Sequence, residues 1–171
     1  MKVVLIGYRA SGKTTVGRLL ASCLQWPLLD VDRGIESKCG KTIKEIFEQD
    51  GEPYYREIES QVVSEMCGQD RHVIAFGGGT IMREQNQVHA QRDALVVYLQ
   101  ADAKELWRRM QLDPDTEKNR PNLSQGGFKE VVEMLAIREP TYIKCANLTL
   151  DATKSSEILA QAIIDVIPSS P

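Results

Sequence analysis

The sequence predicts an α/β fold, a three-layer sandwich in which helices cover both faces of one parallel β-sheet. Five short runs rich in β-forming residues are apolar and continuous rather than alternating, as strands buried on both faces are. Longer amphipathic segments separate these runs, and such alternation is typical of a parallel sheet. The chain has 171 residues, the size of one domain, so we expect residues 1–171 to share one core. The predicted strands are 2–6, 27–30, 72–76, 94–99 and 147–150.

Five helices are predicted from hydrophobic periodicity and from signals at helix ends. Thr42 with Glu45 three residues later forms a capping box, in which each side chain satisfies a backbone N–H at the helix start. The segment 53–68 opens on a proline and closes on a glycine, the usual asymmetry of helix ends. The predicted helical segments are 14–25, 42–51, 53–68, 102–112 and 155–167.

Composition narrows the function classes. The net charge of −3 argues against a protein that binds nucleic acid, because such proteins usually carry a basic face. The four cysteines (Cys23, Cys39, Cys67 and Cys145) are scattered and do not have the spacing of a metal site. We expect them to be buried, reduced thiols of a cytoplasmic protein. No apolar segment reaches the length of a signal peptide or a membrane span. We therefore expect a cytoplasmic protein, a monomer, with no membrane partner.

The segment GYRASGKTT at 7–15 follows the first predicted strand and precedes the first predicted helix. Residues 7–14 match G-x-x-x-x-G-K-[ST], a loop whose backbone N–H groups surround phosphate oxygens. Lys13 would reach the β- and γ-phosphates, and the Thr14 hydroxyl would ligate Mg²⁺. The chain has no guanine-reading N-K-x-D motif and is small for a motor ATPase. The loop therefore indicates a small kinase that uses ATP.

Polar residues follow two further predicted strands, and parallel sheets bind ligands beyond the carboxyl ends of their strands. Asp30 and Asp32 stand two residues apart, on the same side of an extended chain, where one could face the metal's water shell and the other a substrate hydroxyl. The alternative is that Asp32 caps a helix. Three glycines at 77–79 follow the third strand, where close approach of a ligand to the backbone would explain them.

Three arginines and one long polar segment complete the candidate residues. Arg56 lies among acidic neighbours, where a surface salt bridge is the alternative role, and Arg138 is expected near a helix end. Arg120 lies in the polar stretch 112–127, for which a linker is the alternative to a functional lid.

These motifs taken together resemble the shikimate kinase family. The phosphate loop, LLDVD, G-E-x-x-x-R-x-x-E, GGGT, NRP and REPTY occur in one order from Val3 to about Ile164. The resemblance implies a P-loop fold similar to nucleoside monophosphate kinases, with a five-stranded parallel sheet and a mobile lid at about 112–127. It implies transfer of the γ-phosphate of ATP to the 3-hydroxyl of shikimate, a step of aromatic amino-acid biosynthesis.

The resemblance also implies the nucleotide and metal contacts. Lys13 and the loop backbone would hold ATP, while Thr14 and, through water, Asp30 would hold Mg²⁺. Arg120 would stabilise the transferring phosphoryl group, and Arg109 matches a residue that packs on adenine in relatives. The ATP-binding residues implied in this way are Ala10, Ser11, Gly12, Lys13, Thr14, Thr15, Arg109 and Arg120.

On the acceptor side, Asp32 would orient the attacking hydroxyl, so that Lys13, Asp32 and Arg120 are the implied catalytic residues. Arg56 and Arg138 would clamp the shikimate carboxylate, for which bidentate arginine is well suited. The backbone of Gly77, Gly78 and Gly79 would approach the ring. Two other functions remain open: a related kinase of another polyol acid such as gluconate, and a binding protein without catalysis.

Overall fold

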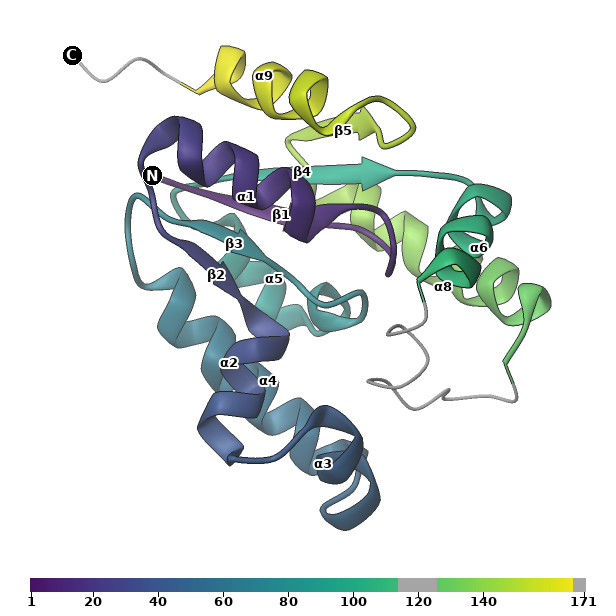
Figure 1. The fold of residues 1–171 in the computed structure, drawn as a ribbon. Coiled ribbons are helices and arrows are strands. Elements are labelled where there is room, and N and C mark those ends of the chain that lie inside the picture. Colours follow the sequence, from purple (N-terminus) through teal and green to yellow (C-terminus); the bar gives the residue numbers. More distant parts are fainter. Residues whose placement is uncertain (114–125, 168–171) are drawn as a thin grey trace.

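The computed structural model describes residues 1–113 and 126–167. All five predicted strands form: β1 (Lys2–Ile6), β2 (Leu28–Asp30), β3 (Val73–Ala75), β4 (Ala94–Gln100) and β5 (Leu148–Asp151). They make one sheet in the order β2-β3-β1-β4-β5, and every pairing is parallel. Figure 1 shows this sheet between two layers of helices. The predicted α/β sandwich with a five-stranded parallel sheet is confirmed.

The two outer strands differ from the central ones in burial. Every residue of β1 and β3 is buried, which agrees with strands covered on both faces. In β5, by contrast, Thr149 and Asp151 are exposed, and Leu148 and Leu150 are half-buried. The expectation of cover on both faces was therefore wrong for β5, in which alternate residues face solvent.

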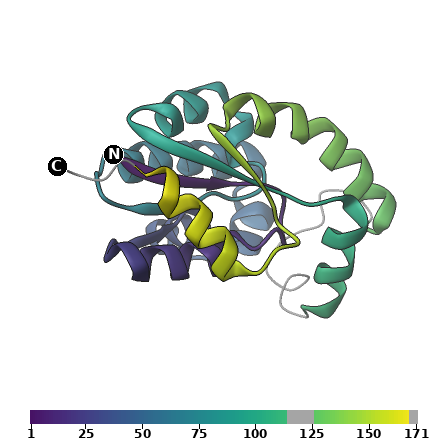
Figure 2. The ribbon, with the colours of Figure 1, turned by 90° about the horizontal axis from the view of Figure 1, so that it is seen from above.

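Two helices cover one face of the sheet, α1 (Lys13–Leu24) and α9 (Ser156–Val166), which pack against each other. Figure 2, from above, shows α9 crossing this face beside α1. The other face is covered by α4 (Glu52–Cys67), α5 (Glu84–Gln91) and α8 (Phe128–Cys145). Helix α6 (Ala103–Leu112) packs against α8. The core between the layers is built from β1, β3 and β4 side chains such as Val4, Ile74 and Val97, all fully buried.

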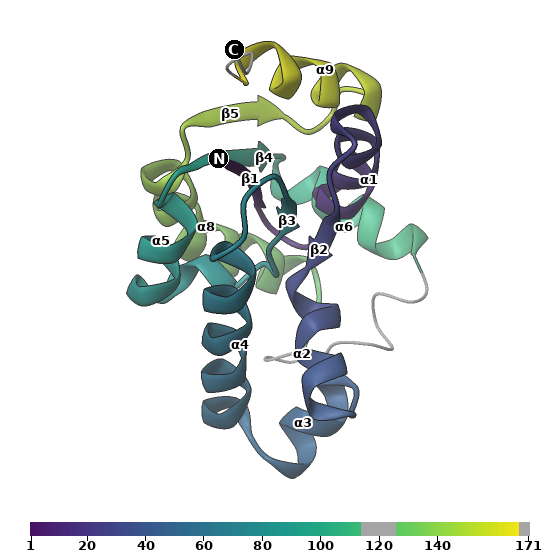
Figure 3. The same cartoon turned by 90° about the vertical axis from the view of Figure 1, so that its left-hand side faces the viewer.

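One end of α4 extends beyond the sheet together with α2 (Val31–Cys39) and α3 (Ile43–Gln49), as Figure 3 shows. The predicted capping box is confirmed: Thr42 accepts from the N–H of Glu45, and Glu45 accepts from the N–H of Thr42. Helix α4 likewise begins after Gly51 with Pro53 in its first turn and ends at Cys67, with Gly68 as its C-cap. These signals fix where α3 begins and where α4 begins and ends.

Three helices were not predicted. Helix α5 buries only Asn86 and Ala90 and has no apolar stripe, whereas α2 has a short one, in which only Val31 and Ile35 are buried. Helix α8 runs through Pro140, a residue that usually ends a helix. A short 3₁₀ helix, η1 (Thr80–Met82), follows the glycines after β3. The predicted lid at 112–127 falls almost entirely on residues 114–125, which lie outside the described residues, and so does Arg120.

Two of the four cysteines differ from the expected burial. Cys67 and Cys145 are buried, whereas Cys39 is partly exposed and Cys23 is exposed. All four are free thiols, as expected from their spacing. In the part of the chain that the structure describes, no helix combines the length and apolarity of a membrane span.

Candidate active site

The phosphate loop lies between β1 and α1 and takes the shape that its glycines allow. Gly7 has φ +146° and Gly12 has φ +97°, conformations that suit glycine. A Cβ at Gly7 would also lie 2.8 Å from the carbonyl oxygen of Leu99. Ala10 adopts φ +63° despite its side chain, which costs about 1 kcal/mol. The loop backbone is therefore held in a strained turn at the N-terminus of α1, where the helix dipole favours an anion.

Lys13 lies over this loop. Its Nζ donates hydrogen bonds to the carbonyl oxygens of Gly7 at 2.9 Å and Tyr8 at 2.8 Å, and the residue is 9% exposed. The ammonium group is thus placed inside the loop by backbone carbonyls. A cavity extends from the loop along α1, α2 and the segment after β5. The predicted nucleotide residues that line it are Ala10, Ser11, Gly12, Lys13, Thr14, Thr15 and Arg109.

Arg109 ties the loop to two other elements. Its guanidinium donates to the carbonyl oxygen of Ala10 at 3.3 Å and to that of Ala152, after β5, at 2.6 Å. Glu105, one turn earlier on α6, accepts from Arg109 Nε at 2.6 Å and also binds Arg108. Hydrogen bonds from these two arginines hold the pKa of Glu105 at about 2, well below the ordinary 4.5. The charge of Arg109 is therefore fixed beside the nucleotide cavity.

Thr14 and Asp30 meet at the base of α1. The Thr14 hydroxyl donates to Asp30 Oδ2 at 3.4 Å, while Asp30 Oδ1 accepts from the backbone N–H of Arg33 at 3.2 Å. Hydroxyl and carboxylate oxygens are the donors that Mg²⁺ prefers. Among the described residues, no three His, Cys, Asp or Glu side chains gather in a metal cluster. The pair therefore fits a magnesium ion whose other ligands are water molecules and phosphate oxygens.

The sequence predicted that Asp30 and Asp32 lie on the same side of an extended chain, and this prediction was wrong. Strand β2 ends at Asp30, which is the N-cap of α2, and Asp32 belongs to the first turn of that helix. The alternative role of Asp32 as the cap was also wrong, because Asp30 takes it. The helical turn still brings Asp32 into the site: its Oδ1 would lie 2.8 Å from a Cβ at Gly77. Asp32 lines both the nucleotide cavity and a second one.

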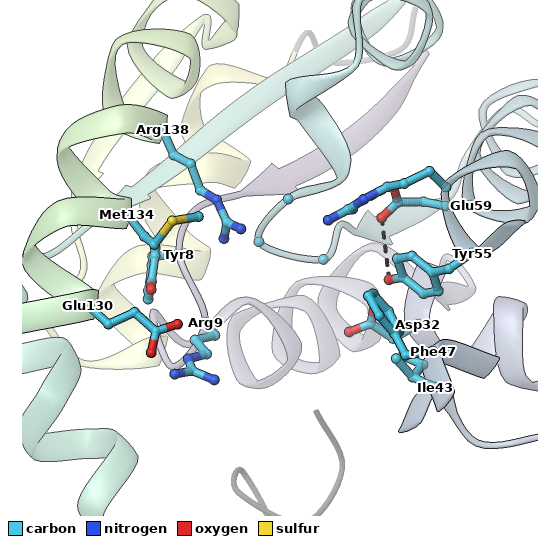
Figure 4. Close-up of a pocket in the computed structure, with 14 residues that line it drawn as sticks. Tyr8, Arg9, Asp32, Ile43, Phe47, Tyr55, Glu59, Glu130, Met134 and Arg138 are labelled. Atoms are coloured by element: carbon cyan, nitrogen blue, oxygen red, sulfur yellow. Dashed lines mark hydrogen bonds and ion pairs between the residues drawn. The ribbon is translucent and has the colours of Figure 1, made fainter. Parts of the chain in front are cut away.

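This second cavity, the acceptor cavity, has two walls that Figure 4 shows facing each other. One wall comes from α2, α3 and α4 and carries Asp32, Phe47, Tyr55 and Glu59. The other wall comes from the phosphate loop and α8. It carries Tyr8, Arg9, Glu130, Met134 and Arg138. The three glycines after β3 form part of the lining, close to side chains of both walls.

Arg56 on α4 is held by a buried carboxylate. Its Nη1 donates to Glu59 Oε2 at 2.9 Å, and Glu59 is only 1% exposed. The other oxygen of Glu59 accepts from the buried Thr80 hydroxyl at 2.7 Å. Burial lowers the pKa of Arg56, but the charge and hydrogen bond of Glu59 outweigh it, so the pKa is raised. Arg56 is therefore a fixed cation of the cavity, with the half-exposed Glu52, 3.5 Å from its Nε, as a second partner on α4.

Arg138 enters from the opposite wall. It lies in the middle of α8 and not near a helix end, because the helix continues through Pro140. Its Cζ lies 5.5 Å from the centre of the Tyr8 ring, a cation–π distance. Tyr142, one turn later on α8, donates its hydroxyl to the carbonyl oxygen of Gly78 at 2.5 Å. This bond anchors α8 to the glycine segment and so fixes the position of Arg138 along the cavity wall.

Glycine is needed at positions 77–79 because neighbouring side chains pack directly against this stretch of backbone. A Cβ at Gly79 would lie 3.0 Å from Arg56 Nη2, and one at Gly78 would lie 3.3 Å from Arg138 Nη1. A side chain at any of the three would push against Asp32, Arg56 or Arg138. The glycines therefore bring two guanidinium groups and one carboxylate close to the same stretch of backbone.

Most predicted site residues thus meet in two adjoining cavities, and Arg120 alone falls outside the described residues. Several lining residues were not singled out. Glu59 was part of the quoted motif, and its position three residues after Arg56 on a helix could have indicated the pair. Tyr8 and Arg9 fill variable positions of the loop pattern, which carries no signal for them. Glu130, Met134 and Arg138 repeat every four residues along α8, a spacing that the sequence does contain.

Comparisons with known proteins agree with this geometry. Residues 9–168 match the family model for shikimate kinase. A shikimate kinase of Burkholderia thailandensis is 38% identical over 157 residues, 91% of this chain and 83% of that protein. One from Rhodopirellula baltica is 38% identical over 169 residues, 97% of this chain and 90% of that protein.

Solved structures give the same result. The shikimate kinase of Acinetobacter baumannii in complex with shikimate superposes with a TM-score of 0.88 at 35% identity, covering 96% of this chain and 91% of that chain. A gluconokinase of Sinorhizobium meliloti has a TM-score of 0.58 at 14% identity, over 94% and 87% of the two chains, which shows a shared fold alone. The family model matches nearly the whole chain, and the relatives agree with it. This chain therefore belongs to the shikimate kinase family.

Proposed function

We propose that this protein is an ATP-dependent kinase that transfers the γ-phosphate of ATP to the 3-hydroxyl of shikimate, giving shikimate 3-phosphate and ADP. The reaction is a step towards chorismate and the aromatic amino acids. The observation that carries the proposal is the acceptor cavity, in which Arg56 and Arg138 approach one glycine segment from opposite walls. A cavity of this kind suits a compact ring with one carboxylate.

On the nucleotide side, we assign ATP to the cavity around the phosphate loop. The loop N–H groups and Lys13 would bind the phosphates, and Arg109 would lie beside the adenosine. Magnesium bound at Thr14 and, through water, at Asp30 would neutralise charge on the β- and γ-phosphates. The support is the position of these residues around one cavity and the oxygen donors that Thr14 and Asp30 supply.

On the acceptor side, Arg56 and Arg138 would bind the two carboxylate oxygens, and the N–H groups of Gly78 and Gly79 would approach the ring. Asp32 lines both cavities, so we assign to it the 3-hydroxyl that must point towards the nucleotide. That hydroxyl oxygen bonds to the γ-phosphorus as the bond to the β–γ bridging oxygen breaks. Its proton passes to Asp32 or, through Asp32, to solvent.

The protein's contribution to this reaction is mainly position and charge. Phosphoryl transfer passes through a loose transition state, so aligning the hydroxyl and stabilising the equatorial oxygens lower the barrier more than a strong base does. We assign part of that stabilisation to Lys13. We also propose, from its place in the sequence, that Arg120 supplies a second cation from a lid at about 112–127 of a single domain 1–171. A lid that excludes water would prevent wasteful hydrolysis of ATP.

The two other functions considered from the sequence lack a specific observation in their favour. The likeness to a gluconokinase is one of fold, and an open-chain acid does not require two arginines beside one glycine segment. A non-catalytic relative would be expected to have lost Lys13 or Asp32, and both are present. A cytoplasmic location, a monomeric state and no binding of nucleic acid or membranes stay predictions from composition.

The test is release of ADP from ATP and Mg²⁺ by the purified protein, with shikimate, gluconate or no acceptor. Release that depends on shikimate and saturates with it supports the proposal, and phosphorus NMR of the product identifies the hydroxyl. A Lys13→Ala variant is the control that removes the phosphate-binding cation. Release with gluconate alone, or no release in spite of ATP binding, would overturn the proposed substrate or the proposed catalysis. Size-exclusion chromatography with light scattering gives the oligomeric state.

A further inference from the structure

The wall of the acceptor cavity that α8 supplies contains a charged residue to which the proposed function gives no role. Glu130, Met134 and Arg138 are spaced by four residues and line the cavity together, as Figure 4 shows. Arg138 is accounted for by the substrate carboxylate, and Met134 supplies apolar contact. Glu130 places a carboxylate in a cavity that is otherwise suited to binding an anion.

Glu130 is incompletely satisfied. Its Oε2 atom is buried and has no hydrogen-bond partner among the described residues, and the same is true of Nε of Arg9. A buried carboxylate oxygen without a donor costs free energy that a stable protein usually avoids. Such an atom in the wall of a ligand cavity is explained when the ligand supplies the missing donor.

The neighbours of Glu130 are arranged to hold a negative charge there. Burial raises the pKa of Tyr8; the charges of Arg9 and Arg138 oppose that rise and the charge of Glu130 adds to it. All three charged groups therefore lie close to the Tyr8 phenol, on one wall. Figure 4 shows the Arg9 and Glu130 side chains on this wall, opposite Asp32. Glu130 is thus a carboxylate that shares the surroundings of the Tyr8 phenol with two cations and lies on the wall opposite Asp32.

The shape of shikimate then selects the hydroxyl. Its ring carries the carboxylate on C1 and hydroxyls on C3, C4 and C5, so C3 and C5 stand on the two sides of the ring. With the carboxylate between Arg56 and Arg138 and the 3-hydroxyl at Asp32, the 5-hydroxyl is directed away from Asp32. The wall that faces Asp32 is the one that carries Glu130.

We propose that Glu130 accepts a hydrogen bond from the 5-hydroxyl of shikimate and is a specificity residue for the acceptor, with Arg9 as its counter-charge. This inference rests on the proposed function. Binding an acceptor without that hydroxyl leaves the carboxylate desolvated and unpaired, whereas the correct acceptor satisfies it. Glu130 therefore rejects ring acids that lack the 5-hydroxyl.

The experiment measures kcat/KM for shikimate, 5-deoxyshikimate and 4-deoxyshikimate in the wild type, Glu130→Ala, Glu130→Gln and Glu133→Ala. Glu133 lies on the same helix, exposed and paired with Lys129 at 3.7 Å, and is the matched control. We expect the wild type and Glu133→Ala to prefer shikimate over the 5-deoxy analogue by about tenfold to a hundredfold. In Glu130→Ala this preference falls towards one, while Glu130→Gln, which keeps an acceptor oxygen, retains part of it.

The ratio is measured within each variant, so a variant that is partly unfolded still gives a valid result. An unchanged preference in Glu130→Ala would overturn the proposal, and loss of discrimination against the 4-deoxy analogue alone would overturn the assignment to the 5-hydroxyl. Failure of the proposed function looks different, because the wild type would then not phosphorylate shikimate at all.

Discussion

Glu59, which is buried, and Arg56, which is 19% exposed, form an ion pair one helical turn apart on α4, with 2.9 Å between Glu59 Oε2 and Arg56 Nη1. The second oxygen of Glu59 is taken by the Thr80 hydroxyl at 2.7 Å. The carboxylate thus joins α4 to the segment after β3 and fixes the direction of a guanidinium that we assign to the substrate. Removing one partner of a buried pair leaves the other uncompensated, which is costly.

Glu59→Gln is therefore expected to raise the shikimate KM by about tenfold or more and to leave the ATP KM nearly unchanged. It should also lower the free energy of unfolding by about 1–3 kcal/mol, since a buried charged hydrogen bond is lost. Steady-state kinetics and urea unfolding measure the two effects. The matched control is Glu52→Gln, whose carboxylate is half-exposed and lies 3.5 Å from Arg56 Nε. Equal effects of both changes would show that Glu59 does not position Arg56.

Gly79→Ala tests the close approach of backbone and guanidinium. The added Cβ would lie 3.0 Å from Arg56 Nη2, so the guanidinium must shift by a few tenths of an ångström. We expect the shikimate KM to rise by about tenfold with little change in stability. Gly68→Ala at the end of α4 is the control, because its Cβ would make ordinary contacts at 3.4 Å. A normal KM in Gly79→Ala would mean that Arg56 is displaced without consequence.

Arg138→Lys tests the second cation. Lysine keeps the charge but lacks the planar fork that binds a carboxylate through two parallel hydrogen bonds. We expect a shikimate KM about tenfold higher and an unchanged ATP KM, measured by varying one substrate at saturation of the other. Arg108→Lys is the control, since Arg108 is exposed and pairs with Glu105 at 2.7 Å. A change confined to the ATP KM would place Arg138 outside the carboxylate site.

Glu105 carries a pH-dependent contribution to stability. Its pKa of about 2 lies below the ordinary 4.5, so its stabilisation is complete above about pH 4.5 and disappears as the pH falls towards 2. The melting temperature of Glu105→Gln should therefore lie below that of the wild type near pH 7, and the difference should shrink on acidification. Because Glu105 holds Arg109, the ATP KM should rise as well. A constant difference down to pH 3 would contradict the assigned pair, with Glu133→Gln as the exposed control.

Arg120→Ala tests the proposed lid cation. A group that contacts the phosphoryl oxygens only in the transition state contributes to kcat, so kcat should fall by about a hundredfold or more. The shikimate dissociation constant, measured by calorimetry without nucleotide, should stay within about twofold. Wild-type kcat in this variant would remove Arg120 from the catalytic residues.

The strands, the phosphate loop and the helix ends were predictable because their signals are local. Gly7 and Gly12 stand where positive φ is needed, and Thr42 and Glu45 cap a helix within four residues. The triple glycine at 77–79 likewise pointed to a ligand site. In the structure, the missing side chains also leave room for Asp32, Arg56 and Arg138 to pack against this backbone.

Tertiary structure decided how those local pieces meet. Glu59 and Thr80 are 21 residues apart, Gly78 and Tyr142 are 64 apart, and Arg109 reaches a loop carbonyl 99 residues away. Periodicity reports which face of an element is apolar, but not which distant element covers it. It therefore missed α2 and the polar helix α5, and the proline in α8 masked the continuous face that carries Glu130 and Arg138. The sequence by itself determined a phosphate-binding α/β kinase, whereas packing across the sheet edge determined which charges share the acceptor cavity.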